Sequence, residues 1–373
     1  MATYKSIRYI VPVEAVEHTD SINALSDVDT NTTAPTDGQI LKWNNTNSKW
    51  YPGDVEEAGS SPTQKAIFGF GSGYTPAYNY TSHNETNLVS STGVVASNTT
   101  GVGTERGNLA AAGYGGDKAI FGFGRSSEYY SGGVGRTNIT NLVSNTGVVA
   151  SDTTGVGTAR DSLTATGYGG DKAIFGFGDN GSTDTNVTNL VSNAGVVATD
   201  TTGVGTAREG SAASGYGSTG QAIFGFGRTN PGNNKVNTIN LVSSTGVVAT
   251  DTTAVGTARD FLAAAGYGGD KAIFGFGNHG VGYPGQTSMT NLVSNTGVVA
   301  SDTTGVGTIR NTLAAASYGG DKAIFGFGHY SFANPNYVNM TNLVSNTGVV
   351  SSDTTGVGLI RDSLAAAGYS TTA

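Results

Sequence analysis

The stretch Gly-Tyr-Gly-Gly-Asp-Lys-Ala-Ile-Phe-Gly-Phe-Gly, residues 113–124, returns along the chain at nearly regular intervals. Two further copies are identical and the others are looser. Complete or partial copies lie at 66–71, 167–178, 215–227, 266–277 and 317–328. The isoleucines of the six copies are spaced 53, 54, 49, 50 and 51 residues apart. A fixed period near fifty residues indicates a repeat architecture.

Each repeat contains four short segments, which we interpret as four β-strands. The segments are Arg-Asp-x-Leu-Ala-Ala-Ala-Gly-Tyr, Lys-Ala-Ile-Phe-Gly-Phe-Gly, Thr-Asn-Leu-Val-Ser, and Gly-Val-Val followed by Asp-Thr-Thr. They are rich in β-formers or in Ala and Gly, turn residues bound them, and none combines helical spacing with helix caps. The predicted fold is therefore all-β: a six-bladed β-propeller of four-stranded blades.

The phase of the repeat predicts how the ring closes. The chain enters the repeat at Ala66–Gly71 without a preceding Leu-Ala-Ala-Ala segment, and it ends just after one, at Arg361–Tyr369. We expect the C-terminal strand to complete the first blade, which removes two exposed sheet edges. The small residues of 109–114 suit the innermost strand, where blades crowd together.

Composition excludes several classes of function. Charged residues make up 12% of the chain, the net charge is −8, and there is no basic stretch, so neither nucleic acid nor an anionic membrane is an expected partner. The absence of cysteine excludes disulfides, thiol catalysis and Cys-ligated zinc. No apolar span approaches the ~18 residues that a membrane-crossing helix needs, and the N-terminus does not read as a signal peptide.

Residues 1–61 lie outside the repeat and form the first predicted domain, and residues 62–373 form the second. The segments 38–43 and 49–52 predict a β-hairpin that carries both tryptophans, Trp43 and Trp50. A lone hairpin is marginally stable in water, so we expect a partner to cover it.

Two resemblances add to this interpretation. The run Arg-x-x-Leu-Ala-Ala-Ala-Gly-Tyr-Gly-Gly-x-Lys-Ala-Ile-Phe-Gly-Phe-Gly, followed by Thr-Asn-Leu-Val, resembles a kelch-type repeat. Gly-Phe-Gly stands where that family has a double glycine, and the late tryptophan of the family is absent. The resemblance implies a propeller and says little about function.

The N-terminal order Leu25-Ser-Asp-Val-Asp29, Asp37-Gly-Gln39, Trp43 and Lys49-Trp50 resembles a module of bacteriophage tail fibres and other virion proteins. That resemblance implies a virion structural protein on the tail or particle surface, assembled in the host cytoplasm. It also implies that residues 1–61, with Trp43 and Trp50, attach the protein to other virion proteins, and that the chain forms a homotrimer.

The connections between the second and third segments differ completely among the repeats, whereas the strands barely change. Rigid scaffolds that vary on one loop face are typical of binding proteins, and tyrosine-rich loops make adaptable contact surfaces. We therefore expect this loop face to bind a host surface receptor, a glycan or a protein. The candidate residues are Tyr74, Tyr78, Tyr80, His83, Tyr129, Tyr130, His279, Tyr283, His329, Tyr330, Phe332 and Tyr337.

One arginine recurs in each repeat, and an aspartate recurs in five of them. A ring of arginines could bind an anion at the centre, but a structural hydrogen bond or ion pair that joins each blade to its neighbour is the favoured interpretation. The arginines are Arg106, Arg160, Arg208, Arg259, Arg310 and Arg361. The aspartates are Asp152, Asp200, Asp251, Asp302 and Asp353.

No catalytic motif is present, so we expect no enzyme activity and no cofactor. The three loop histidines lack a nearby carboxylate cluster in the sequence, and no metal site is predicted. Two alternatives to receptor binding stay open. One is a capsid decoration or tail component that contacts only virion proteins, and the other is a glycan-cleaving enzyme.

Overall fold

The computed structural model describes residues 27–28, 39–44, 46–54, 64–74, 80–126, 135–280, 285–331 and 336–371. The chain divides into two compact units, Met1–Ser60 and Ser61–Ala373. The described residues of both units form strands, turns and irregular segments. None of these residues belongs to a helix long and apolar enough to cross a membrane.

The first unit contains the predicted hairpin. Strands β1 (Gln39–Asn44) and β2 (Lys49–Asp54) pair in antiparallel fashion, with Trp43 opposite Trp50. In the turn, the Thr46 amide donates a hydrogen bond of 2.9 Å to the Asn44 side chain. The two indole rings meet edge to face, with centroids 5.4 Å apart.

The described part of the second unit contains six larger antiparallel sheets, each with a first, second and third strand. The first strands are β5 (Ala110–Tyr114), β8 (Thr164–Tyr168), β11 (Ala212–Tyr216), β17 (Ala263–Tyr267), β20 (Ala314–Tyr318) and β23 (Ala365–Ser370). The second strands are β6 (Lys118–Gly122), β9 (Lys172–Gly176), β12 (Gln221–Gly225), β18 (Lys271–Gly275), β21 (Lys322–His329) and β3 (Gln64–Tyr74). The third strands are β7 (Thr140–Val143), β10 (Thr188–Val191), β15 (Thr238–Val242), β19 (Thr290–Val293), β22 (Tyr337–Val344) and β4 (Tyr80–Val89). The all-β class is thus confirmed.

The predicted fourth strand is largely wrong. Only β16 (Thr252–Thr253) is a strand, and it makes one sheet four-stranded; elsewhere the Gly-Val-Val and Asp-Thr-Thr segments pair through single bridges such as Val143 with Val149 and Thr140 with Thr153. Glycine and the polar Asn, Asp and Thr residues interrupt the pairing, because they favour turns over a continuous ladder. A separate two-stranded ribbon, β13 (Arg228–Thr229) with β14 (Asn234–Lys235), lies in one loop.

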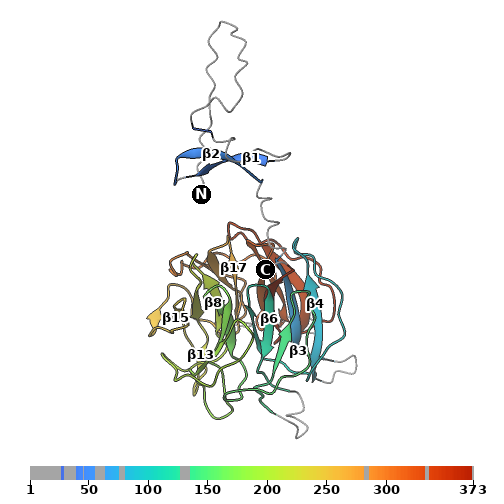
Figure 1. The fold of residues 1–373 in the computed structure, drawn as a ribbon. Coiled ribbons are helices and arrows are strands. Elements are labelled where there is room, and N and C mark those ends of the chain that lie inside the picture. Colours follow the sequence, from blue (N-terminus) through green and yellow to red (C-terminus); the bar gives the residue numbers. More distant parts are fainter. Residues whose placement is uncertain are drawn as a thin grey trace, which may run out of the picture. The chain divides into compact units, whose positions relative to one another are not determined.

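The C-terminal strand completes the sheet that the first repeat begins. Strand β23 pairs with β3 over six residues, with Ala367 opposite Ile67, and Figure 1 shows the red C-terminal end beside β3 and β4. The predicted pairing of the last strand with the first repeat is therefore confirmed.

Backbone hydrogen bonds of 2.7 to 2.9 Å join the six sheets just before their first strands. Each amide donates to the carbonyl of the equivalent residue in the preceding sheet, and the last bond returns to the first. We call these residues the mouth ring. In order they are Asn108, Ser162, Gly210, Phe261, Thr312 and Ser363.

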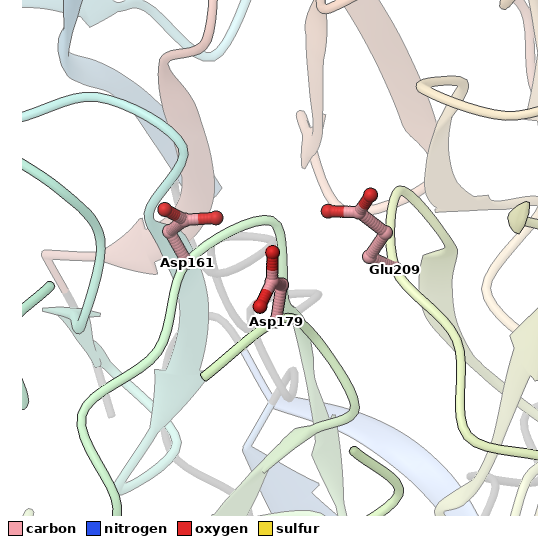
Figure 2. Close-up of side chains that lie close together, drawn as sticks. All are labelled: Asp161, Asp179 and Glu209. Carbon is pink, nitrogen blue, oxygen red and sulfur yellow. The ribbon is translucent and has the colours of Figure 1, made fainter. Parts of the chain in front are cut away.

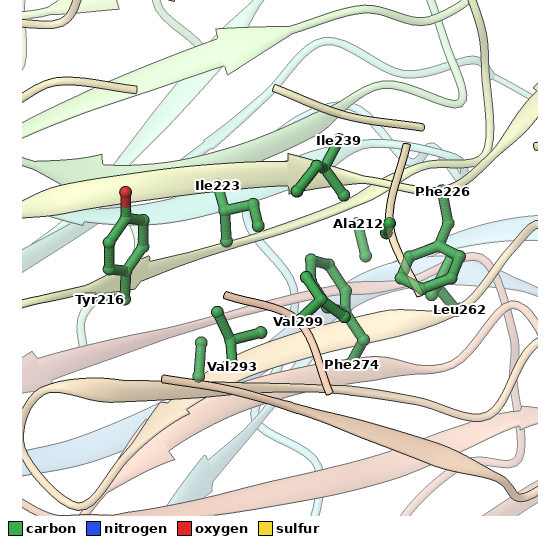
Figure 3. Packing of buried hydrophobic residues seen from close by; sticks show 11 residues of the cluster. Ala212, Tyr216, Ile223, Phe226, Ile239, Leu262, Phe274, Val293 and Val299 are labelled. Carbon is green, nitrogen blue, oxygen red and sulfur yellow. The ribbon is translucent and has the colours of Figure 1, made fainter. Parts of the chain in front are cut away.

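The hydrophobic core is divided into six clusters, each between two neighbouring sheets. Figure 3 shows one of them, in which Ile223 and Phe226 of one sheet pack against Phe274 and Val293 of the next. Both faces of each second strand are buried; Ala119, Ile120 and Phe121 expose none of their surface. A Cβ on Gly122 would lie 2.8 Å from the Phe175 ring, so the first glycine of Gly-Phe-Gly allows neighbouring sheets to approach.

The phenylalanine of each Gly-Phe-Gly adopts a left-handed backbone that aromatic residues normally avoid. The φ angles of these six residues lie between 62° and 65°. This conformation turns each ring toward the next sheet, where Phe70 and Phe121, for example, have centroids 5.1 Å apart. The strain is compensated by complete burial of the ring.

Removing residues 365–373 should abolish cooperative folding of the second unit, because it deletes β23 and leaves one edge of β3 unpaired. Thermal unfolding by circular dichroism and size-exclusion chromatography will measure the effect. Removal of residues 372–373 alone is the control and should leave the melting curve unchanged. An unaltered melting temperature in the longer truncation would contradict a structural role for β23.

Candidate functional site

The two ends of the six sheets differ in which segments of the chain lie there. At one end Gln64 pairs with Ser370, so the chain enters and leaves the second unit there; at the other end Tyr74 pairs with Tyr80. The bridge between Gly107 and Arg125 belongs to this second end, together with its equivalents in the other sheets. We call it the loop end, because the variable connections lie there and the mouth ring adjoins them.

The structure describes seven of the twelve predicted loop residues, at least in their backbone. Tyr74 is the last residue of β3, Tyr80 is the first residue of β4, and His83 lies further along β4. His279, His329, Tyr330 and Tyr337 are also described, and the side chains of all but Tyr337 are partly exposed. The residues outside the described part are Tyr78, Tyr129, Tyr130, Tyr283 and Phe332.

His329 is held by its neighbours. Its ring meets that of Tyr337 edge to face at 5.7 Å, and the Gln286 side-chain amide lies 2.9 Å from its Nδ1. Burial lowers the pKa of His329, so the imidazole is neutral at neutral pH. The neutral ring can form a hydrogen bond with a ligand, but it has no positive charge with which to attract an acidic one.

His83 lies in a different setting, beside Glu85 at 3.4 Å. Burial lowers the pKa of His83 and Arg361 adds to that effect, although Glu85 opposes it. The buried Nε2 atom of His83 has no hydrogen-bond partner. Among the described residues, the one group of three metal-binding side chains includes no histidine.

That group consists of Asp161, Asp179 and Glu209, whose carboxylates point toward a common space in Figure 2. Arginines already neutralise it: Arg136 lies 3.1 Å from Asp161 and 2.9 Å from Asp179, and Arg228 lies 2.7 Å from Glu209. Guanidinium groups at these distances supply the positive charge that a cation would otherwise bring. We therefore assign no metal to these carboxylates.

The six repeated arginines are buried completely between neighbouring sheets. Arg106 shows the arrangement: its guanidinium lies 4.3 Å from the Phe70 ring centroid of the adjacent sheet. In its own sheet, it donates hydrogen bonds of 2.8 Å to the Phe123 carbonyl and 2.7 Å to the Asn141 side chain. Burial lowers the pKa of Arg106 to about 10, while Asp152 opposes the shift, so the group stays charged at neutral pH.

The repeated aspartates hold the segment that carries the arginine. Asp152 accepts hydrogen bonds from the Thr104 hydroxyl at 2.6 Å and from the Asn141 side chain at 2.9 Å. The asparagine of Thr-Asn-Leu-Val thus connects the arginine to the aspartate, a role that we did not predict. The recurrence of this asparagine in the third strand of all six repeats was the available signal. The six asparagines are Asn87, Asn141, Asn189, Asn240, Asn291 and Asn342.

Cavities lie where the six first strands meet. At the loop end, a cavity of about 80 Å³ is lined by the mouth ring and by the residue that follows each of its members. A larger cavity of about 480 Å³ lies toward the entry end. Lys118, Lys172 and Lys271 line the larger one, and each is paired with the aspartate that precedes it at 2.6 to 2.8 Å.

Asp362 is a buried carboxyl at the loop end. Its Oδ2 accepts a hydrogen bond of 3.1 Å from the Thr312 hydroxyl, and its Oδ1 has no partner. Burial raises the pKa of Asp362 to about 7, only partly offset by hydrogen bonds from Thr312 and Ser363. The folded protein therefore retains a proton on Asp362 at pH values at which the unfolded chain has lost it.

No protein-family model matches the chain, and a search of curated proteins found no similar sequence.

Replacing Arg259 with Met should lower the free energy of unfolding by about 3 kcal/mol, because the Phe276 carbonyl and the Asn291 side chain lose their buried donor. Chemical denaturation will measure this. Lys271→Met, which alters an exposed cation at the entry end, is the matched control and should change little. Equal stability of the two variants would exclude a structural role for the buried arginine.

Asp362→Asn should change how stability depends on pH. A folded-state pKa raised above the unfolded value stabilises the fold below about pH 4, and this contribution is lost as the pH rises toward 7. As the pH rises from about 4 to about 7, the free energy of unfolding of Asp362→Asn should therefore increase relative to that of wild type by up to about 4 kcal/mol. Chemical denaturation at several pH values will measure the difference.

Asp302→Asn serves as the control, with the opposite slope. Burial acts to raise the pKa of Asp302, but hydrogen bonds from Thr257 and Asn291 outweigh it and lower the pKa. This variant should lose stability at neutral pH, and the loss should shrink in acid. Parallel pH profiles for wild type and Asp362→Asn would show that Asp362 ionises normally in the folded protein.

Proposed function

We propose that the six larger sheets are the blades of a six-bladed β-propeller. Three observations support this. The first strands contact one another in the cyclic order β5, β8, β11, β17, β20, β23 and back to β5. The hydrogen bonds of the mouth ring follow the same order, and β23 pairs with β3, which lies about 300 residues away along the chain.

We further propose that the protein is a bacteriophage virion component, similar to a tail fibre, whose loop end binds a receptor on the host surface. The observation that carries this proposal is that the point of chain entry and the variable segments lie at opposite ends of the sheets. The chain enters at Gln64, whereas the segments that vary among repeats lie at the opposite end of the same strands. A module attached by one end thus presents its variable surface at the other.

The described loop residues suit a carbohydrate receptor. His279, His329 and Tyr330 are partly exposed at the loop end and combine aromatic surface with hydrogen-bonding atoms. In the first unit, Trp43 exposes 44% of its surface and packs against Trp50. An indole pair with one exposed ring on a small hairpin supports attachment to other virion proteins, and a homotrimer follows from the tail-fibre resemblance.

Labelled full-length protein should bind saturably to susceptible bacterial cells and should compete with phage adsorption. Tyr330→Ala, which removes an aromatic ring at the loop end, should weaken binding, whereas Lys271→Ala at the entry end should not. Flow cytometry of cells titrated with folded protein will measure both. The cells should come from a panel of strains that are infected by the phage encoding this protein. If the folded protein binds none of these strains, the receptor-binding proposal fails. A role confined to contacts within the virion then takes its place.

A further inference from the structure

The loop-end cavity is surrounded by the most variable positions of an otherwise constant segment. In each repeat, an arginine stands two residues before the mouth ring, and in five of six repeats a leucine follows it. The mouth ring itself holds Asn108, Ser162, Gly210, Phe261, Thr312 and Ser363, all with φ between 49° and 61°. The backbone is the same in every repeat, so the fold does not dictate which side chain stands at each of these positions.

Among the residues of the mouth ring, Phe261 is the one whose residue type is least suited to the left-handed backbone conformation. Its φ is 49°, a left-handed conformation that Asn, Ser and Gly adopt more readily, and those residues occupy four of the other five positions. The Gly-Phe-Gly phenylalanines share this conformation, but they are fully buried in the core. Phe261 instead remains partly exposed and lines the cavity, with the Arg228 guanidinium 4.7 Å from its ring centroid. Retained backbone strain at a cavity suggests a function for the ring.

Unpartnered polar groups surround the same cavity. Ser211, which stands where the other five repeats have leucine, lines the cavity with a buried hydroxyl that has no hydrogen-bond partner. One carboxylate oxygen in Asp260 and one in Asp362 also lack a partner; these residues precede Phe261 and Ser363 and do not themselves line the cavity. The side chain of Asn108 also makes no hydrogen bond to another described residue. Such groups in a folded protein call for a polar ligand or ordered water.

The charges around the cavity favour an uncharged ligand. In the part of the chain that the structure describes, the cations near the mouth are already paired with carboxylates. Arg125 lies 3.5 Å from Asp161, Arg228 lies 2.7 Å from Glu209, and Lys235 lies 3.4 Å from Asp260. An anionic ligand would therefore have to displace an existing ion pair. The volume of about 80 Å³ is well below the ~300 Å³ of a typical drug-sized site, and it suits the end of a larger molecule.

We propose that this cavity binds the terminal, uncharged sugar residue of a glycan, with the Phe261 ring against its C–H groups and with Asn108 and Ser211 hydrogen-bonded to its hydroxyls. A sugar ring combines an apolar face with polar edges, and this cavity combines one aromatic ring with unpartnered donors and acceptors. The inference rests on the proposed receptor-binding function and adds to it a subsite and a ligand class.

The test uses full-length protein and a panel of free sugars: glucose, galactose, mannose and N-acetylglucosamine, with N-acetylneuraminic acid as the anionic comparison. Saturation-transfer NMR will detect binding, and titration will give the affinity. We expect at least one neutral sugar to bind and the anionic one not to bind. Phe261→Ser should weaken the binding about tenfold, the effect of removing about 1.4 kcal/mol of contact.

The Phe261→Ser substitution is a favourable one for the fold, because Ser162 and Ser363 already occupy equivalent positions with the same backbone. The melting temperature of this variant should equal or exceed that of wild type, so lost binding will not reflect unfolding. Asn108→Ser is a second variant of the same kind and should also weaken binding. Lys271→Ala, at the entry end, should bind like wild type.

The outcomes separate the two proposals. If the protein binds host cells but no neutral sugar, the subsite inference is wrong and receptor binding stands. Sugar binding that neither Phe261→Ser nor Asn108→Ser weakens would place the site elsewhere and overturn the inference. Exclusive binding of the anionic sugar would do the same. If neither cells nor sugars are bound, both proposals fail, and the unpartnered groups hold ordered water only.

Discussion

A charged guanidinium buried between two sheets is the constraint on which the rest of the second unit depends. Arg361 illustrates it: the guanidinium lies 4.6 Å from the Phe327 ring centroid of one sheet and donates to Asn87 of the next. Burying a cation is costly unless it is hydrogen-bonded, so the aromatic ring and the amide must be in place together. All six arginines make these two contacts, which couple each sheet to its neighbour. In five of them the Nε also donates to a phenylalanine carbonyl, whereas the Nε of Arg361 has no partner.

The unusual backbone of Gly-Phe-Gly follows from that requirement. The phenylalanine turns into the left-handed region to place its ring under the arginine, and the glycine before it lets the next sheet's phenylalanine approach. These contacts leave little freedom in the strands, where a single added carbon on Gly122 would clash with Phe175. Most of the variation therefore lies at the loop end, where the repeats differ in length and chemistry; at the entry end, the turn 217–221 differs from its equivalents.

Much of this fold can be predicted from the sequence, because the signals are local and repeated. Periodicity located every strand of the three-stranded sheets, and the phase of the repeat predicted the pairing of β23 with β3. The prediction of a fourth strand was largely wrong. The apolar valines of Gly-Val-Val indicated a strand, but the neighbouring glycine and polar residues restrict the pairing to single bridges. The candidate site was predicted as a list of loop aromatics. The mouth ring was missed because its members share no residue type; the available signal was their constant position two residues after the repeated arginine.

The sequence alone determined the repeat, the all-β class, the order of strands and the end of the chain that supplies the missing strand. Each of these depends on residues close together in the chain or on exact repetition. Only the tertiary structure decided that Asn87 would meet Arg361, that Asp362 would be buried beside Thr312, and that Phe261 would line a cavity with Asn108 and Ser211. These contacts join residues 50 to 274 positions apart, and the burial that alters their chemistry exists only once all six sheets have come together.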